Sequence, residues 1–275
     1  MVELRALQWS LLAAMLALWH WVTRNPDVAF FFGEPLVVLR RIWTWFTRGD
    51  GSLQIGPGRA GWFTLHLPAE IYPHLIVTLS ETVIAFVIGA ALGTAAGLWL
   101  ALAPRTGVVL HPYVKAANSM PRVILAPIFA TWFGLGIWSK VALAITLVFF
   151  VVFFNVYQGV KEVDPGILAS SRVMGASRRQ LLHTVYLPSA LSWLFSSLHN
   201  AVGLAFVGAV VGEYLGSARG IGYLILQAEG TFDVNGVFAG IIVLTVFALL
   251  LDGMVSLIER RYMIWRPALG ETRRL

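Results

Sequence analysis

The chain of 275 residues contains no cysteine, and only 12% of its residues are charged. The absence of cysteine excludes a disulfide framework and any thiolate metal or redox chemistry. A Gly-x-x-x-x-Gly-Lys-Ser/Thr loop is also absent, because none of the three lysines, Lys115, Lys140 and Lys161, lies in such a context. The chain therefore cannot hold ATP phosphates in the usual P-loop way. We find no internal repeat either, which argues against the inverted halves typical of secondary carriers.

Hydrophobic residues are abundant instead, at 58% of the chain, and the mean hydropathy is +0.76. Several apolar runs approach the ~20 residues that a bilayer core requires. This composition predicts an all-α polytopic membrane protein in contact with lipid. The formal charge of +6 does not indicate nucleic acid, because most Lys and Arg residues lie in short segments beside apolar runs, where they set topology. We assign no metal site and no cofactor to this chain.

Six segments are predicted to cross the membrane: 8–23, 74–103, 108–133, 138–158, 190–215 and 236–259. The third contains Lys115, Asn118, Arg122 and the prolines Pro121 and Pro127, so we expect a broken helix surrounded by protein or by a water-filled cavity. The distribution of basic residues in short loops and tails places both termini in the cytoplasm.

Three regions follow from this topology. Residues 1–73 are predicted to hold the first span and an external segment, whose stretch 35–46 suits either an interfacial helix or a helix packed on its neighbours. Residues 74–260 form a core with a cytoplasmic hairpin at 161–188, and residues 261–275 form a basic cytoplasmic tail. Within the core, Gly89, Gly93 and Gly97 permit close contact with a neighbouring helix; a hinge is the alternative.

The hairpin is a polar, basic island between two long apolar segments. Asp164 and Pro165 predict a helix start, Gly175 breaks the helical pattern, and Ser177 can cap a second short helix. Leu181, Leu182 and Val185 form an apolar stripe opposite Arg178 and Arg179, and Pro188 marks the return to the membrane. We therefore expect a docking element for a cytoplasmic partner, fitted to a groove on that partner.

The island resembles the coupling motif of the permease subunits of binding-protein-dependent ABC importers. Ala169, Ser170 and Ser171 stand where that family usually has Glu-Ala-Ala, and Gly175, Val185, Leu187 and Pro188 match. The resemblance implies that the ATPase contact is made by Ala169, Ser170, Ser171, Arg172, Gly175, Ala176, Ser177, Leu187 and Pro188. The change of Glu to Ala169 removes one polar contact that the family pattern would supply.

Further motifs extend the resemblance over residues 74–258. They include Pro121-Arg122, Trp132-Phe133-Gly134-Leu135-Gly136, Ser139-Lys140, Glu213-Tyr214-Leu215-Gly216 and Gly220-Ile221-Gly222-Tyr223. These are similar to the subgroup that serves nitrate, bicarbonate, taurine, aliphatic sulfonates and thiamine-pyrimidine precursors. The resemblance implies a type I ABC importer permease fold in a bacterial inner membrane, without catalysis of its own. Its implied partners are two ATP-binding subunits, which hold ATP and Mg, a second permease copy and a periplasmic binding protein.

Polar residues at membrane depth are the candidates for a pathway, because they are costly in lipid. We select Arg122, Asn155, Asn200 and Glu213; ion pairing, headgroup contact and helix-to-helix hydrogen bonds are the alternative roles, as they are for Glu81 and His199. The positive charges of Lys115 and Arg122 favour an anionic solute such as nitrate, bicarbonate, a sulfonate or taurine. A permease for a thiamine-pyrimidine precursor, an ion-coupled carrier and a non-transport scaffold remain as alternatives.

Overall fold

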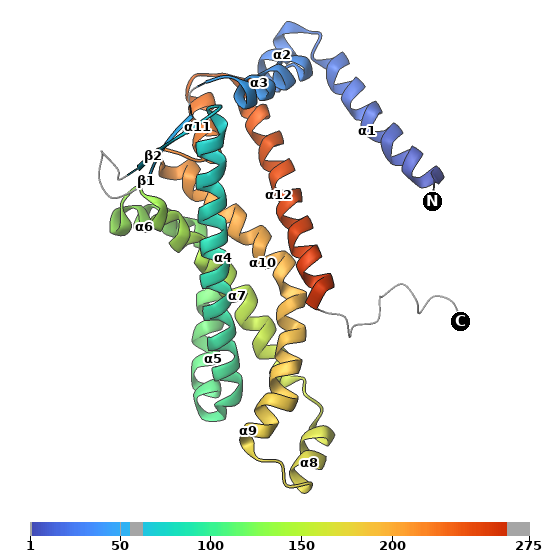
Figure 1. Cartoon of the computed structure of the whole chain (residues 1–275), viewed down its shortest axis with the longest axis vertical. Helices are drawn as coiled ribbons and strands as arrows, with labels where there is room; N and C mark the ends of the chain where they lie inside the picture. The colour runs from blue at the N-terminus through green and yellow to red at the C-terminus, as the bar shows by residue number, and fades with distance from the viewer. Residues whose placement is uncertain (1, 50, 56–62, 263–275) are drawn as a thin grey trace. The chain divides into compact units, whose positions relative to one another are not determined.

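The computed structural model describes residues 2–49, 51–55 and 63–262, and it is helical except for one β-hairpin (Figure 1). The chain begins with α1 (Val2–Val22), α2 (Pro26–Phe32), α3 (Pro35–Thr47), β1 (Gly51–Ile55) and β2 (Phe63–Leu67). It continues with α4 (Ile71–Leu102), α5 (Pro104–Asn118), η1 (Arg122–Leu125), α6 (Ala126–Phe133), α7 (Ile137–Lys161), α8 (Pro165–Val173), α9 (Arg178–Leu181), η2 (Leu182–Tyr186), α10 (Leu187–Gly216), α11 (Ile221–Gly230) and α12 (Val234–Tyr262). The chain divides into two compact units, Met1–Thr78 with Gly216–Val246, and Leu79–Leu215 with the remainder.

The first unit is organised around a small apolar cluster of Ile71, Ile221 and Val243, against which Ile42 and Trp45 of α3 pack. The predicted helix at 35–46 is therefore present as α3, and one of its faces packs on its neighbours. An ion pair between Arg41 of α3 and Asp233 adds a polar link within this unit.

Two elements of the first unit were not predicted. The strands β1 and β2 pair in antiparallel register, with Gly51 opposite Leu67 and Leu53 opposite Leu65. Apolar and polar residues alternate along both strands, which is the pattern of a half-buried hairpin. The helix α11 begins after Gly220, whose φ of +111° favours glycine, and the backbone N–H of Ile221 donates to Thr78 Oγ1 at 3.0 Å.

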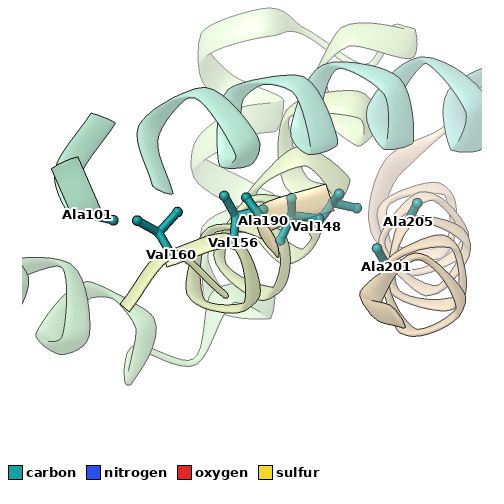
Figure 2. Close-up of a cluster of buried hydrophobic side chains, with 8 residues drawn as sticks. Ala101, Val148, Val156, Val160, Ala190, Ala201 and Ala205 are labelled. Carbon is teal, nitrogen blue, oxygen red and sulfur yellow. The ribbon is translucent and has the colours of Figure 1, made fainter. Parts of the chain in front are cut away.

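The second unit contains the larger core, in which small and β-branched residues of α7 and α10 pack together (Figure 2). Its buried members are Ala101, Val148, Val152, Val156, Val160, Ala190, Ala201 and Ala205. The predicted close contact at Gly89, Gly93 and Gly97 is confirmed, because α7 lies directly against all three. A Cβ on Gly93, for example, would lie 2.7 Å from the Phe149 carbonyl oxygen. Residues of this size let the helix backbones approach closely.

Four of the six predicted spans coincide with long apolar helices, and the other two, 8–23 and 108–133, overlap shorter ones. Four helical stretches are long and apolar enough to cross a membrane: they lie within α4, α7, the Arg178–Gly230 region and α12. Residues 6–22 and 122–133 form shorter apolar helices. The predicted segment 108–133 is broken into α5, η1 and α6, because Pro121 lacks an amide hydrogen and disfavours helix at the residue before it. The predicted basic tail lies outside the described residues from 263 onward.

Candidate functional site: a basic hairpin and a polar pocket

The first half of the hairpin at 161–188 forms as the sequence predicts. Asp164 caps α8, its side chain accepting a hydrogen bond from the Gly166 amide at 2.6 Å. Gly175 takes the left-handed conformation with φ of +82°. Ser177 and Gln180 then form a capping box at the start of α9. These local bonds satisfy the helix ends and hold the bend, which Figure 1 shows at the far end of α7 and α10.

The second half of the hairpin differs from the prediction. Instead of a separate short helix, α9 continues through the π-helical turn η2 into α10, and the Leu187 amide bonds to the Leu182 carbonyl five residues back. The adjacent Pro188 has no N–H to complete the regular ladder, which accounts for the wider turn. The predicted apolar stripe also faces inward at its first residue, since Leu181 is buried.

The apolar surface that the hairpin does expose lies at its bend. Val173 and Met174 are 88% and 80% exposed, although both are large and apolar. Among the residues assigned to the ATPase contact, Ala169, Ser170 and Arg172 of α8 are exposed as well. Exposed apolar side chains beside small residues are typical of a contact surface. Val173 and Met174 were not predicted to form this surface, because an amphipathic helical pattern does not mark apolar residues at a turn.

A second feature is a polar pocket between α5, α7 and α10. A cavity of about 670 Å³ is lined by Asn118, Phe150, Val151, Phe154, Asn155, His199, Asn200, Gly203 and Leu204. An adjoining cavity of about 500 Å³ shares Asn118, Phe154 and Asn155 with it and adds His111, Lys115, Tyr157, Gln158 and Trp193. No acidic residue lines either cavity within the part of the chain that the structure describes. The predicted candidates Asn155 and Asn200 are thus brought together.

Arg122, although it does not line the pocket, contacts two residues that do. Its Nη2 donates to the Asn118 carbonyl at 2.7 Å and also bonds the Asn118 side chain, and its guanidinium lies 4.7 Å from the centre of the Phe150 ring. The Nε atom of Arg122 is buried without a hydrogen-bond partner among the described residues. Arg122 therefore fixes two lining residues and brings its positive charge close to the pocket.

Two lining residues are held by neighbouring groups. The Asn155 amide nitrogen donates to the Val151 carbonyl at 2.8 Å, so its side chain is fixed against its own helix. His199 Nδ1 lies 3.0 Å from the Asp252 carboxylate on α12, within the same unit. His199 was considered from the sequence but not selected for the pathway. Its contact with Asp252 was not predictable, because the two residues are 53 positions apart.

Glu213, the fourth pathway candidate, does not line this pocket. It lies fully buried in the second unit, where its side chain hydrogen-bonds Glu81 of α4 and interacts with the Lys140 ammonium of α7. From the sequence, each carboxylate could be placed only alone or beside an arginine. The contact of Glu213 with Glu81 and Lys140 was not predictable, because the three residues belong to three different helices.

Comparisons with known proteins agree with this geometry. A family described as "Binding-protein-dependent transport system inner membrane component" matches residues 72–264. A permease protein named for aliphatic sulfonates transport in Bacillus subtilis is 34% identical over 202 residues, which cover 74% of this chain and 73% of that protein. A formylaminopyrimidine transport permease protein of Halalkalibacterium halodurans is 35% identical, over 71% of this chain and 78% of its own length. The taurine transport system permease protein of Escherichia coli is 28% identical, over 72% of each.

A solved structure has the same fold. The inward-facing MetNI methionine ABC transporter matches with a TM-score of 0.59 at 20% identity, covering 70% of this chain and 97% of that chain. The likeness at this identity concerns the fold alone. It agrees with a type I ABC importer permease architecture.

Proposed function

The chain belongs to the family of binding-protein-dependent transport system inner membrane components, and from this premise we propose that it forms the pathway of an ATP-driven importer for a small anion of the sulfonate or taurine type. The observation that carries the substrate class is the pocket. Asparagine side chains line it, and the Arg122 guanidinium contacts Asn118 and Phe150. Amides and a guanidinium donate hydrogen bonds to oxyanions, and a positive potential concentrates them.

The hairpin supplies the energy coupling in this proposal. Hydrolysis takes place on separate ATP-binding subunits, since the chain has no P-loop lysine of its own. The exposed Val173 and Met174 at the bend, beside the small residues of α8, enter a groove on each ATP-binding subunit. Two copies of the chain face one another, and the open side of the pocket is closed by the second copy. A periplasmic binding protein delivers the solute from outside, with both termini of the permease in the cytoplasm.

A second substrate class is favoured by a different observation. Phe150 and Phe154 line the same pocket, and aromatic faces beside amide groups suit a flat heterocycle such as a formylaminopyrimidine. One of the relatives is named for that solute. Uptake of an aliphatic sulfonate and of a formylaminopyrimidine separates the two classes.

The test is uptake into proteoliposomes that hold the permease, its ATP-binding subunits and the cognate binding protein. We expect Arg122→Ala to lower uptake of the sulfonate about tenfold or more, because Asn118 of the pocket wall loses its hydrogen bond from the charged guanidinium. Arg105→Ala is the matched control, because Arg105 is an exposed arginine, whereas Arg122 bonds Asn118 and lies over the Phe150 ring of the pocket wall. Equal uptake by wild type and Arg122→Ala, with the complex fully assembled, would remove the anion proposal.

A further inference from the structure

Three charged side chains from three helices lie buried together in the second unit. Glu81 of α4, Lys140 of α7 and Glu213 of α10 are 1%, 1% and 0% exposed. The two carboxyl groups hydrogen-bond one another, and the ammonium interacts electrostatically with both. Buried ions persist only where partners compensate their lost hydration, so this cluster is a built feature of the helix bundle.

The Lys140 ammonium is also bound to a turn of the backbone. Its Nζ donates to the Leu135 carbonyl at 2.5 Å and to the Gly136 carbonyl at 3.0 Å. An ammonium group has three donors, so two of the three go to the turn that joins α6 to α7. Ser139 Oγ donates to the same Gly136 carbonyl at 2.9 Å. Side chains of α7 therefore hold the turn in place.

Glycines on α10 make room for the lysine stem. A Cβ on Gly212 would lie 2.8 Å from Lys140 Cγ, and a Cβ on Gly208 would lie 2.6 Å from Ala144 Cα. Both distances are too short for a real contact, so α10 approaches α7 this closely only because these positions carry no side chain. The place of Lys140 is thus set by packing as well as by charge.

The charges in the cluster balance when one proton is counted. Two ionised carboxylates offer only acceptors, so a hydrogen bond between Glu81 and Glu213 requires a proton on one of them. One carboxylate and one ammonium then remain, and their charges cancel. Glu81 Oε2 has no hydrogen-bond partner among the described residues, which marks Glu81 as the less firmly held carboxyl group. A neutral amide at position 81 should therefore be tolerated.

The turn lies at the end of the segment that starts with Arg122. The helices η1 and α6 run without interruption from Arg122 to Phe133, and the turn that Lys140 holds follows directly. At the other end of this segment, Arg122 contacts Asn118 and Phe150 of the pocket wall. The segment is therefore fixed at both ends, by Arg122 at one and by Lys140 at the other.

We propose that Lys140 is a positioning residue for transport: its ammonium, balanced by the single negative charge of the Glu81–Glu213 pair, fixes the turn at Leu135–Gly136 so that η1 and α6 keep Arg122 at the pocket wall. This inference rests on the proposed function, since it concerns the same pocket. The position of the turn itself can be measured without any transport activity.

The experiment separates charge balance from positioning. Because the chain has no cysteine, a nitroxide attached to Leu135→Cys measures the mobility of the turn. The ratio of substrate-stimulated to basal ATP hydrolysis is measured separately in the assembled complex. Lys140→Met leaves the buried carboxyl groups without a cation, so we expect poor assembly. Adding Glu213→Gln to Lys140→Met removes a charge of each sign, and we expect assembly to recover. The double variant should nevertheless show a mobile turn and a stimulation ratio lowered about tenfold, as the loss of charged hydrogen bonds implies.

Two further variants complete the test. Glu81→Gln leaves the hydrogen bonds of Lys140 to the turn in place, so we expect the mobility of the turn and the stimulation ratio of wild type. If neither Lys140 variant assembles, Gly212→Ala decides, because it keeps all three charges and displaces the lysine stem. An assembled double variant, or Gly212→Ala, with the nitroxide spectrum of wild type would overturn the proposal. A complex whose wild type shows no stimulation would instead count against the proposed function, and the nitroxide result would still stand.

Discussion

Substitution of Gly175 tests whether the bend of the hairpin contacts a separate ATPase. Gly175 has a φ of +82°, and a Cβ built there meets no atom within 4 Å. Alanine therefore adds backbone strain without a clash inside this chain. A left-handed conformation costs an L-residue about 1–2 kcal/mol, which corresponds to a factor of about 5–30 in the population of the bent hairpin. Asparagine adopts this conformation more readily, and its cost should be smaller.

Tryptophan separates strain from docking. Since the space around Gly175 is open in this chain, the strain of Gly175→Trp should equal that of Gly175→Ala. Any additional loss must come from a partner against which the indole collides. We expect the affinity for the ATP-binding subunit, titrated with the permease in nanodiscs, to fall in the order Gly, Asn, Ala, Trp. Gly230→Ala is the matched control, being in equally open space without a positive φ.

Two results would refute this reasoning. If alanine and tryptophan weaken binding equally, the bend is strained but contacts nothing, and the docking surface lies elsewhere. If all three variants bind as the wild type does, the hairpin is not the contact at all. Retention of the permease in the membrane has to be shown for each variant.

Other predictions concern packing and topology. Gly93→Ala should lower the free energy of unfolding by about 1–3 kcal/mol, because its Cβ would lie 2.7 Å from a backbone carbonyl oxygen of α7. The thermal unfolding midpoint of the detergent-solubilised permease measures this loss. The control Gly253→Ala, in open space on α12, should leave the midpoint unchanged. Single cysteines at Thr231 and Ser177, both exposed, should react with an impermeant maleimide from outside and from inside the cell respectively. Labelling of Ser177→Cys from outside would contradict the assigned orientation.

Local features were predictable from the sequence because they depend on neighbours along the chain. Asp164, Gly175 and Ser177 each act on backbone groups within a few residues, and all three were identified correctly. The break near Pro121 follows from the same kind of argument. The contact of the glycines of α4 with another helix was predictable from their spacing, although the identity of that helix was not.

Features that depend on tertiary packing were not predictable. Glu213 was selected for the pathway because polar groups at membrane depth are costly in lipid, with an ion pair to an arginine as an alternative; nothing in the sequence pairs it with Lys140 and Glu81. The burial of Leu181 was not predictable for the same reason. An amphipathic pattern shows that a helix has an apolar face, but it does not show whether that face packs inside the chain or against a partner. The hairpin of β1 and β2 was missed for a different reason: the alternation was present, but it is brief and lies in a segment read for its Pro and Gly content.

The source of energy is the central claim, and one measurement tests it directly. Proteoliposomes with the permease, the ATP-binding subunits and the binding protein are loaded with ATP or with a non-hydrolysable analogue, with and without an imposed proton or sodium gradient. If ATP hydrolysis drives uptake, solute accumulates only with hydrolysable ATP, and solute-loaded binding protein raises the rate of hydrolysis. Accumulation driven by an ion gradient alone, with no ATP consumed, would contradict it.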